Sequence, residues 1–263
     1  MSSGPKNRKH LPLQDAPLRV SGLAIKVVAK MVAGTAPNER RLREVVVDKL
    51  LAAVLSADPL AFEAMRPDLR RARITAAMLA DTYIPEVARK LGQGWEDDCM
   101  SFVEVSIGTA RLQAILREIG ASWSADERAE GGITTVLVIV PQGEQHTLGA
   151  MVLISQLRRR GVSVCLRFGP GIAEMRRLLE GRLFDGVMIS LSNLDKVPEV
   201  TRLVQNIREA APRPLFVALG GVVLQEPKDL LARTGVDLAT NDIDAVLKSL
   251  RPLAVPLSLF ETV

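Results

Sequence analysis

The feature that most constrains the fold is a run of apolar, mostly β-branched residues, Ile133–Val140, that directly follows Gly131-Gly132. A continuous apolar run of this kind is typical of a strand buried on both faces, as in parallel sheets covered by helices. Helical and strand-like patterns alternate after it as far as Leu250. We therefore predict a flavodoxin-like α/β domain with a parallel five-stranded sheet over residues 133–263.

The expected elements of this domain follow from apolar periodicity and from the positions of glycine and proline. Strands are expected at residues 133–140, 162–168, 184–191, 214–219 and 236–239. Helices are expected at residues 147–160, 171–180, 198–211, 227–234 and 242–250.

The chain before this domain shows a helical period, with apolar residues three and four positions apart. We expect a helix capped by Asn38, a second that begins at Pro59, and a third around Met78. A fourth should span 81–91 and end at Gly92-Gln93-Gly94, and a fifth should span 101–119. We therefore predict a helical bundle over 18–120, preceded by a disordered basic tail at 1–17 and followed by an acidic linker at 121–132.

Composition favours a cytoplasmic protein. Hydrophobic residues make up 48% and charged residues 24% of the 263 residues, as in ordinary soluble proteins. No apolar stretch approaches the roughly 20 residues of a membrane span, and the N-terminus lacks the apolar run of a secretory signal. Cys99 and Cys165 lack metal-ligand spacing, so we expect two buried free thiols in a reducing compartment.

Basic residues are unevenly distributed within a net charge of +4. The residues concerned are Lys6, Arg8, Lys9, Arg40, Arg41, Arg43, Arg70, Arg71 and Arg73. They could contact an acidic partner or DNA phosphates, or they could simply form solvated helix faces. The sequence contains no helix-turn-helix or zinc-finger pattern that would decide between these interpretations.

Three short motifs end successive predicted strands. Glu144-Gln145-His146-Thr147-Leu148-Gly149 follows the first strand, Ser190-Leu191-Ser192 ends the third, and Gly220-Gly221 ends the fourth. Ligands of parallel sheets bind beyond the carboxyl ends of the strands, and all three motifs lie at that edge. Taken singly, the histidine could be a surface residue and the glycines a tight turn. Together they predict a ligand slot beside the first strand.

These motifs resemble the D-x-H-x-x-G, S-x-L and G-G motifs of the cobalamin-binding domains in methionine synthase, corrinoid methyl carriers and related photoreceptors. The resemblance extends over residues 133–250 and includes the segment 235–242. It implies a bound cobalamin, in the adenosyl or hydroxo form, with His146 as the lower cobalt ligand. It further implies a nucleotide-tail slot lined by Gly149, Ser190, Ser192, Gly220 and Gly221.

Two departures from the family pattern concern the same motifs. Glu144 replaces an aspartate that orients the histidine, and its extra methylene leaves open whether it contacts His146 directly. Ser192 replaces a leucine, which would make that part of the slot more polar.

The helical half resembles the cap that precedes cobalamin domains, through residues 83–92 and Gly94-Trp95. In those caps a tryptophan covers the upper face of the corrin, so Trp95 is the matching residue; alternatively, it packs inside the bundle. A Glu-His pair follows that tryptophan in methyl carriers and cobalamin photoreceptors. Here the place reads Glu104-Val105-Ser106, which leaves the upper ligand open.

The segment 95–113 is most similar to the AerR/PpaA group of cobalamin-dependent antirepressors of photosynthesis genes in purple bacteria. The resemblance implies a light-responsive transcriptional regulator that binds a PpsR/CrtJ-type repressor. Two alternatives stay open: a corrinoid methyl carrier that serves a methyltransferase, and a haem sensor that uses the same histidine. The sequence shows no nucleophile or acid–base pair, so we do not expect an enzyme.

Overall fold

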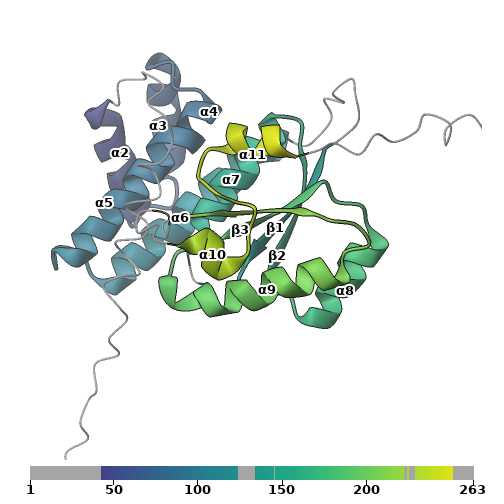
Figure 1. Cartoon of the computed structure of the whole chain (residues 1–263). Coiled ribbons are helices and arrows are strands. Elements are labelled where there is room, and N and C mark those ends of the chain that lie inside the picture. The colour runs from purple at the N-terminus through teal and green to yellow at the C-terminus, as the bar shows by residue number, and fades with distance from the viewer. Residues whose placement is uncertain (1–42, 124–133, 145, 222–223, 225–228, 251–263) are drawn as a thin grey trace, which may run out of the picture.

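The computed structural model describes residues 43–123, 134–144, 146–221, 224 and 229–250 (Figure 1). A helical part precedes an α/β part in the chain. The predicted basic tail, Arg40, Arg41 and residues 124–132 of the predicted linker lie outside the described residues.

The sheet confirms the predicted fold class. Its strands are β1 (Thr135–Val140), β2 (Ser163–Phe168), β3 (Gly186–Ser190), β4 (Phe216–Gly220) and β5 (Leu238–Ala239). They are all parallel and are ordered β2-β1-β3-β4-β5, which is the flavodoxin-like order. In this order the chain reverses direction across the sheet between β1 and β3, so the loops after these two strands lie side by side.

Helices cover both faces of the sheet, and alternate strand residues point to opposite faces (Figure 1). One face packs Val136, Val138, Met188 and Ala218 against α7 (Leu148–Arg159) and α11 (Ile243–Ser249). The other face carries the helices α8 (Ile172–Gly181), α9 (Val197–Ala210) and α10 (Leu230–Thr234). The run at residues 136–140 is buried on both faces, as its composition predicts.

The helical part, here called the cap, is built on one apolar core. Its elements are α2 (Glu44–Leu55), α3 (Ala61–Arg71), α4 (Ala76–Met78), the π-helical turn η1 (Leu79–Tyr83), α5 (Ile84–Glu96), α6 (Phe102–Gly120) and the 3-10 turn η2 (Ala121–Trp123). Leu148, Met151 and Val152 of α7 join this core, so the cap packs directly on the α/β part.

The predicted end of a helix at Gly92-Gln93-Gly94 is wrong, because α5 continues to Glu96. A Cβ atom on Gly94 would lie 2.7 Å from Sδ of Met100, so this glycine permits close packing of the chain that follows α5. Trp95 therefore stands on a helix and not in a loop.

The cysteines also differ from expectation. Cys99 is exposed in the turn between α5 and α6, and Cys165 on β2 is half-buried, so they are not two buried thiols. Within the described part of the chain, no helix has the length and apolar character needed to cross a membrane.

Candidate ligand site at the carboxyl edge of the sheet

His146 lies in the loop between β1 and α7, with its ring held on one side only. Its Nδ1 is 3.0 Å from Oε1 of Glu144 and 3.3 Å from Oγ of Ser192. The side chain is 20% exposed, and among the described residues no hydrogen bond or ion pair involves Nε2. A ring that gives its Nδ1 proton to a carboxylate keeps the lone pair of Nε2 for a metal.

Glu144 is the buried partner that sets this arrangement, with 3% of its side chain exposed. Burial alone would raise its pKa. Hydrogen bonds from His146 and Ser192 outweigh that effect and lower the pKa from 4.5 to about 2. Its oxygens also accept from the backbone N–H of His146 at 3.2 Å and of Ser192 at 3.0 Å. The longer side chain therefore contacts His146 directly.

Ser192 has a different place from the one predicted. It is buried and does not line the cavity described below. Its backbone N–H and hydroxyl hold Glu144 and His146, because the loop after β3 lies beside the loop after β1. The replacement of leucine by serine thus supports the histidine and does not make the slot more polar.

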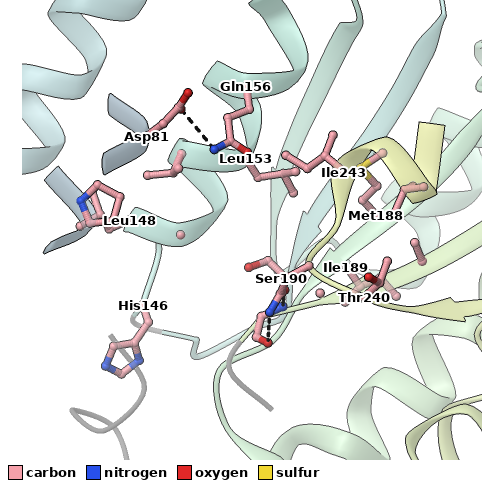
Figure 2. Close-up of a pocket in the computed structure, with 18 of the residues that line it drawn as sticks. Asp81, His146, Leu148, Leu153, Gln156, Met188, Ile189, Ser190, Thr240 and Ile243 are labelled. Atoms are coloured by element: carbon pink, nitrogen blue, oxygen red, sulfur yellow. Dashed lines mark hydrogen bonds between the residues drawn. The ribbon is translucent and has the colours of Figure 1, made fainter. Parts of the chain in front are cut away.

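A cavity of about 130 Å³ opens beside His146 and runs between α7 and α11 over β3 and β4 (Figure 2). Figure 2 shows His146 at one end and Met188 and Ile243 at the other. Of the predicted slot residues, the structure brings Gly149, Ser190, Gly220 and Gly221 together on its wall. The deep wall is mainly apolar.

The two glycines after β4 serve different purposes. Gly221 has a φ of +115°, and a Cβ atom there would lie 2.1 Å from the backbone oxygen of Leu191. Asn241 fixes this turn: its Oδ1 accepts from the Gly221 N–H at 2.7 Å, and its Nδ2 donates to the Gly221 carbonyl at 3.1 Å. A Cβ atom on Gly220 would lie 3.3 Å from the oxygen of Thr240, so the chain tolerates more there.

Sequence reasoning missed most of the cavity wall. The additional lining residues are Asp81, Pro85, Ala88, Leu148, Val152, Leu153, Gln156, Met188, Ile189, Ala218, Thr240, Asn241, Ile243 and Val246. A helical step of three and four residues from Gly149 through Gln156 was the available signal for α7. Nothing in the sequence alone indicates that the η1–α5 region meets that face.

Trp95 lies outside the cavity wall. It is half-buried, is not part of the cap core formed by the described residues, and packs edge-on against Phe102 with ring centroids 5.8 Å apart. It follows Ala88 of the cavity wall by seven residues, about two helical turns, so both project from one side of α5. The alternative that Trp95 packs the bundle interior is therefore wrong.

Two other sequence candidates have structural partners. Glu104 forms a capping box with Ser101 at the start of α6, its carboxylate accepting from the Ser101 N–H at 2.7 Å. In the arginine cluster, Arg43 donates to the carbonyl of Ala72 at 2.9 Å and Arg71 pairs with Asp68, whereas Arg70 and Arg73 are exposed.

Comparisons with known proteins give one relative in sequence and a match in fold. The chain is 39% identical over 180 residues to the uncharacterized 20.5 kDa protein in the bchF-crtJ intergenic region of Rhodobacter capsulatus. The match covers 68% of this chain and 94% of that protein. No protein-family model matches the chain.

Among solved structures, the monomethylamine corrinoid protein of Methanosarcina barkeri superposes with a TM-score of 0.59 at 12% identity. The match covers 79% of this chain and 98% of that one, and it shows a shared fold. A cobalamin-binding protein of Desulfitobacterium hafniense DCB-2 covers 77% of the chain at 15% identity, with a TM-score of 0.37.

Proposed function

The chain belongs to the family of the 20.5 kDa protein of the Rhodobacter capsulatus bchF-crtJ intergenic region, and we propose that it regulates photosynthesis genes. The protein is a cobalamin-dependent, light-responsive antirepressor, and its partner is a PpsR/CrtJ-type repressor. The observation that carries this proposal is a histidine–carboxylate pair at the mouth of a deep apolar slot beneath a helical cap. The role is regulatory and not catalytic.

The residues present fit a cobalamin. His146 offers one imidazole nitrogen, which suits a metal whose other ligands come from a macrocycle. Glu144 and Ser192 would orient that ring, and the slot lined by Ser190 and Gly220 would take the nucleotide tail. Haem has no such tail, so the slot favours cobalamin. An adenosylcobalamin held by these residues would supply light-sensitive cobalt–carbon chemistry.

The antirepressor role draws on two further observations. Asp81, Pro85 and Ala88 of the cap share the cavity with the α/β part, so a ligand held there contacts both halves. A ligand shifts a conformational equilibrium only by binding one state better than another, and cap position is the natural element with two states. The relative is encoded next to the gene crtJ, and the CrtJ-type repressors carry the same name.

Absorption titration of the full chain tests the cofactor. We expect adenosylcobalamin and hydroxocobalamin to bind with a spectral change that signals histidine coordination, and we expect His146→Ala to lose that change. Purification with haem, or an unchanged spectrum in His146→Ala, would contradict the assignment.

Sedimentation of a PpsR/CrtJ-type repressor with the apo-protein, the dark adenosylcobalamin complex and the illuminated complex tests the role. We expect the three forms to associate to different extents. Equal association of all three would refute an antirepressor. Association with a methyltransferase instead would favour a methyl carrier.

A further inference from the structure

One polar group in the cavity wall has no part in holding His146. Asp81 lies on the π-helical turn η1 of the cap and is 36% exposed. Its Oδ1 accepts from Nε2 of Gln156 at 3.2 Å (Figure 2). The same oxygen also pairs with Arg159 of α7. Among the described residues, Oδ2 of Asp81 has no hydrogen-bond partner. Single π-helical turns within helices are frequently found at functional sites.

The position of Asp81 is fixed from the α7 side. The side chain of Arg159 is only 16% exposed, and its guanidinium carbon lies 4.5 Å from the centre of the Trp123 ring. Its Nε donates to the carbonyl of Ser155 at 3.2 Å. Arg159 does not line the cavity, so its charge is directed at Asp81 and not at a ligand.

The free side-chain polar atoms that Asp81 and Gln156 present to the cavity are both acceptors. A carboxylate can only accept, so the Gln156 amide must turn its nitrogen to Asp81, and its oxygen is left over. Oδ2 of Asp81 and Oε1 of Gln156 therefore remain for a ligand, while the neighbouring Pro85, Ala88 and Val152 are apolar. Such a wall matches an N–H donor and repels a carboxylate.

We propose that Asp81 determines specificity by accepting a hydrogen bond from a primary amide side chain on the rim of the corrin ring. This inference rests on the proposed function. The corrin of cobalamin carries acetamide and propionamide groups around its rim, and incompletely amidated corrinoids carry carboxylates in some of these places. The same wall would disfavour the propionates of haem.

The test is a binding titration in the dark with hydroxocobalamin and with its separated b-, d- and e-monocarboxylic acids. The full chain should bind at least one of the three acids roughly tenfold or more weakly than cobalamin, since hydrogen bonds to charged groups are the stronger ones. Asp81→Asn keeps an oxygen for Arg159 but offers N–H groups. This variant should bind cobalamin more weakly than the unsubstituted chain does. Its affinity for the discriminated acid should equal or exceed its affinity for cobalamin.

Asp244→Asn is the matched control, because Asp244 also pairs with an arginine, Arg160, which directly follows α7 and lies 2.9 Å away. Asp244 is 62% exposed and lies off the cavity wall, so its substitution should leave the affinity ratio unchanged.

The ratio of the affinities for cobalamin and for the acids is measured on the unsubstituted chain. It therefore tests the inference even if Asp81→Asn is too unstable to fold. Equal affinity for cobalamin and all three acids would overturn the inference, as would an unchanged ratio in a folded Asp81→Asn. In both results the His146 spectral change persists, so the proposed function survives. A chain that binds no cobalamin at all overturns both.

Discussion

Replacement of Glu144 by glutamine tests how the site prepares His146 for cobalt. The two carboxylate oxygens face only donors: the ring and backbone of His146, and the backbone N–H of Ser192. Glutamine has one oxygen and one NH₂ group. Whichever way the amide turns, one buried donor meets another donor.

Each orientation has a distinct cost. If the oxygen faces His146, the NH₂ group opposes the Ser192 N–H at the present 3.0 Å, and a buried donor is left unsatisfied. If the NH₂ group faces His146, it donates to Nδ1 and moves the ring proton to Nε2, which blocks coordination. Changes to such supporting carboxylates typically cost 10–100-fold in metal affinity, or about 1.4–2.7 kcal/mol.

We therefore expect Glu144→Gln to bind hydroxocobalamin about 10–100-fold more weakly, measured by absorption titration at neutral pH. Glu144→Asp is the control, because it keeps the carboxylate and restores the aspartate of the cobalamin-binding family that this site resembles. It should lose less affinity for hydroxocobalamin than Glu144→Gln does. Glu144→Gln could instead bind with the affinity and spectrum of the parent, while His146→Ala still lacks the histidine-coordination spectrum. That result would refute the argument that this carboxylate prepares the ring.

Three further predictions concern the same site. His146→Ala should abolish the coordination spectrum while the melting temperature stays within a few degrees, because the ring is outside the three apolar cores of the described residues; a large drop in melting temperature would instead indicate a structural role. Gly220→Leu should fill the slot and weaken cobalamin binding in a protein with normal circular dichroism, whereas Gly221→Ala should destabilise the fold itself, because its Cβ would lie 2.1 Å from a backbone oxygen. Trp95→Ala should reduce the difference in repressor association between dark and illuminated complexes, measured by sedimentation; an undiminished difference would remove Trp95 from the mechanism.

The sequence predicts the sheet and its edge well, because these depend on local composition. Five β-branched or apolar positions in a row can be buried only in a strand covered on both sides, as Val136–Val140 are. Strand–helix alternation then dictates which loops meet. This is why the sequence alone assigns Glu144, His146, Ser190 and Gly220 to one edge of the sheet.

Residues whose position depends on packing between distant segments could not be predicted. Gly94 lies inside α5 where Met100 packs so closely that a Cβ atom would clash with it, and the glycine alone does not reveal this contact. Asp81 reaches the cavity because a π-helical turn and Arg159 place it there. The role of Ser192 depends on the direction of its backbone N–H, which residue type does not encode.

The position of α7 between the two halves has a thermodynamic consequence. Ile154 and Leu157 contribute to the core on the sheet, while Leu148, Met151 and Val152 contribute to the core of the cap. Unfolding of the cap would expose Leu148, Met151 and Val152 to water, and unfolding of the sheet would expose Ile154 and Leu157, at a cost of about 1.5–3 kcal/mol per fully buried large apolar group. The cap and the sheet should therefore unfold in one cooperative transition, and a fragment that begins at residue 134 would expose an apolar stripe along α7 that invites aggregation.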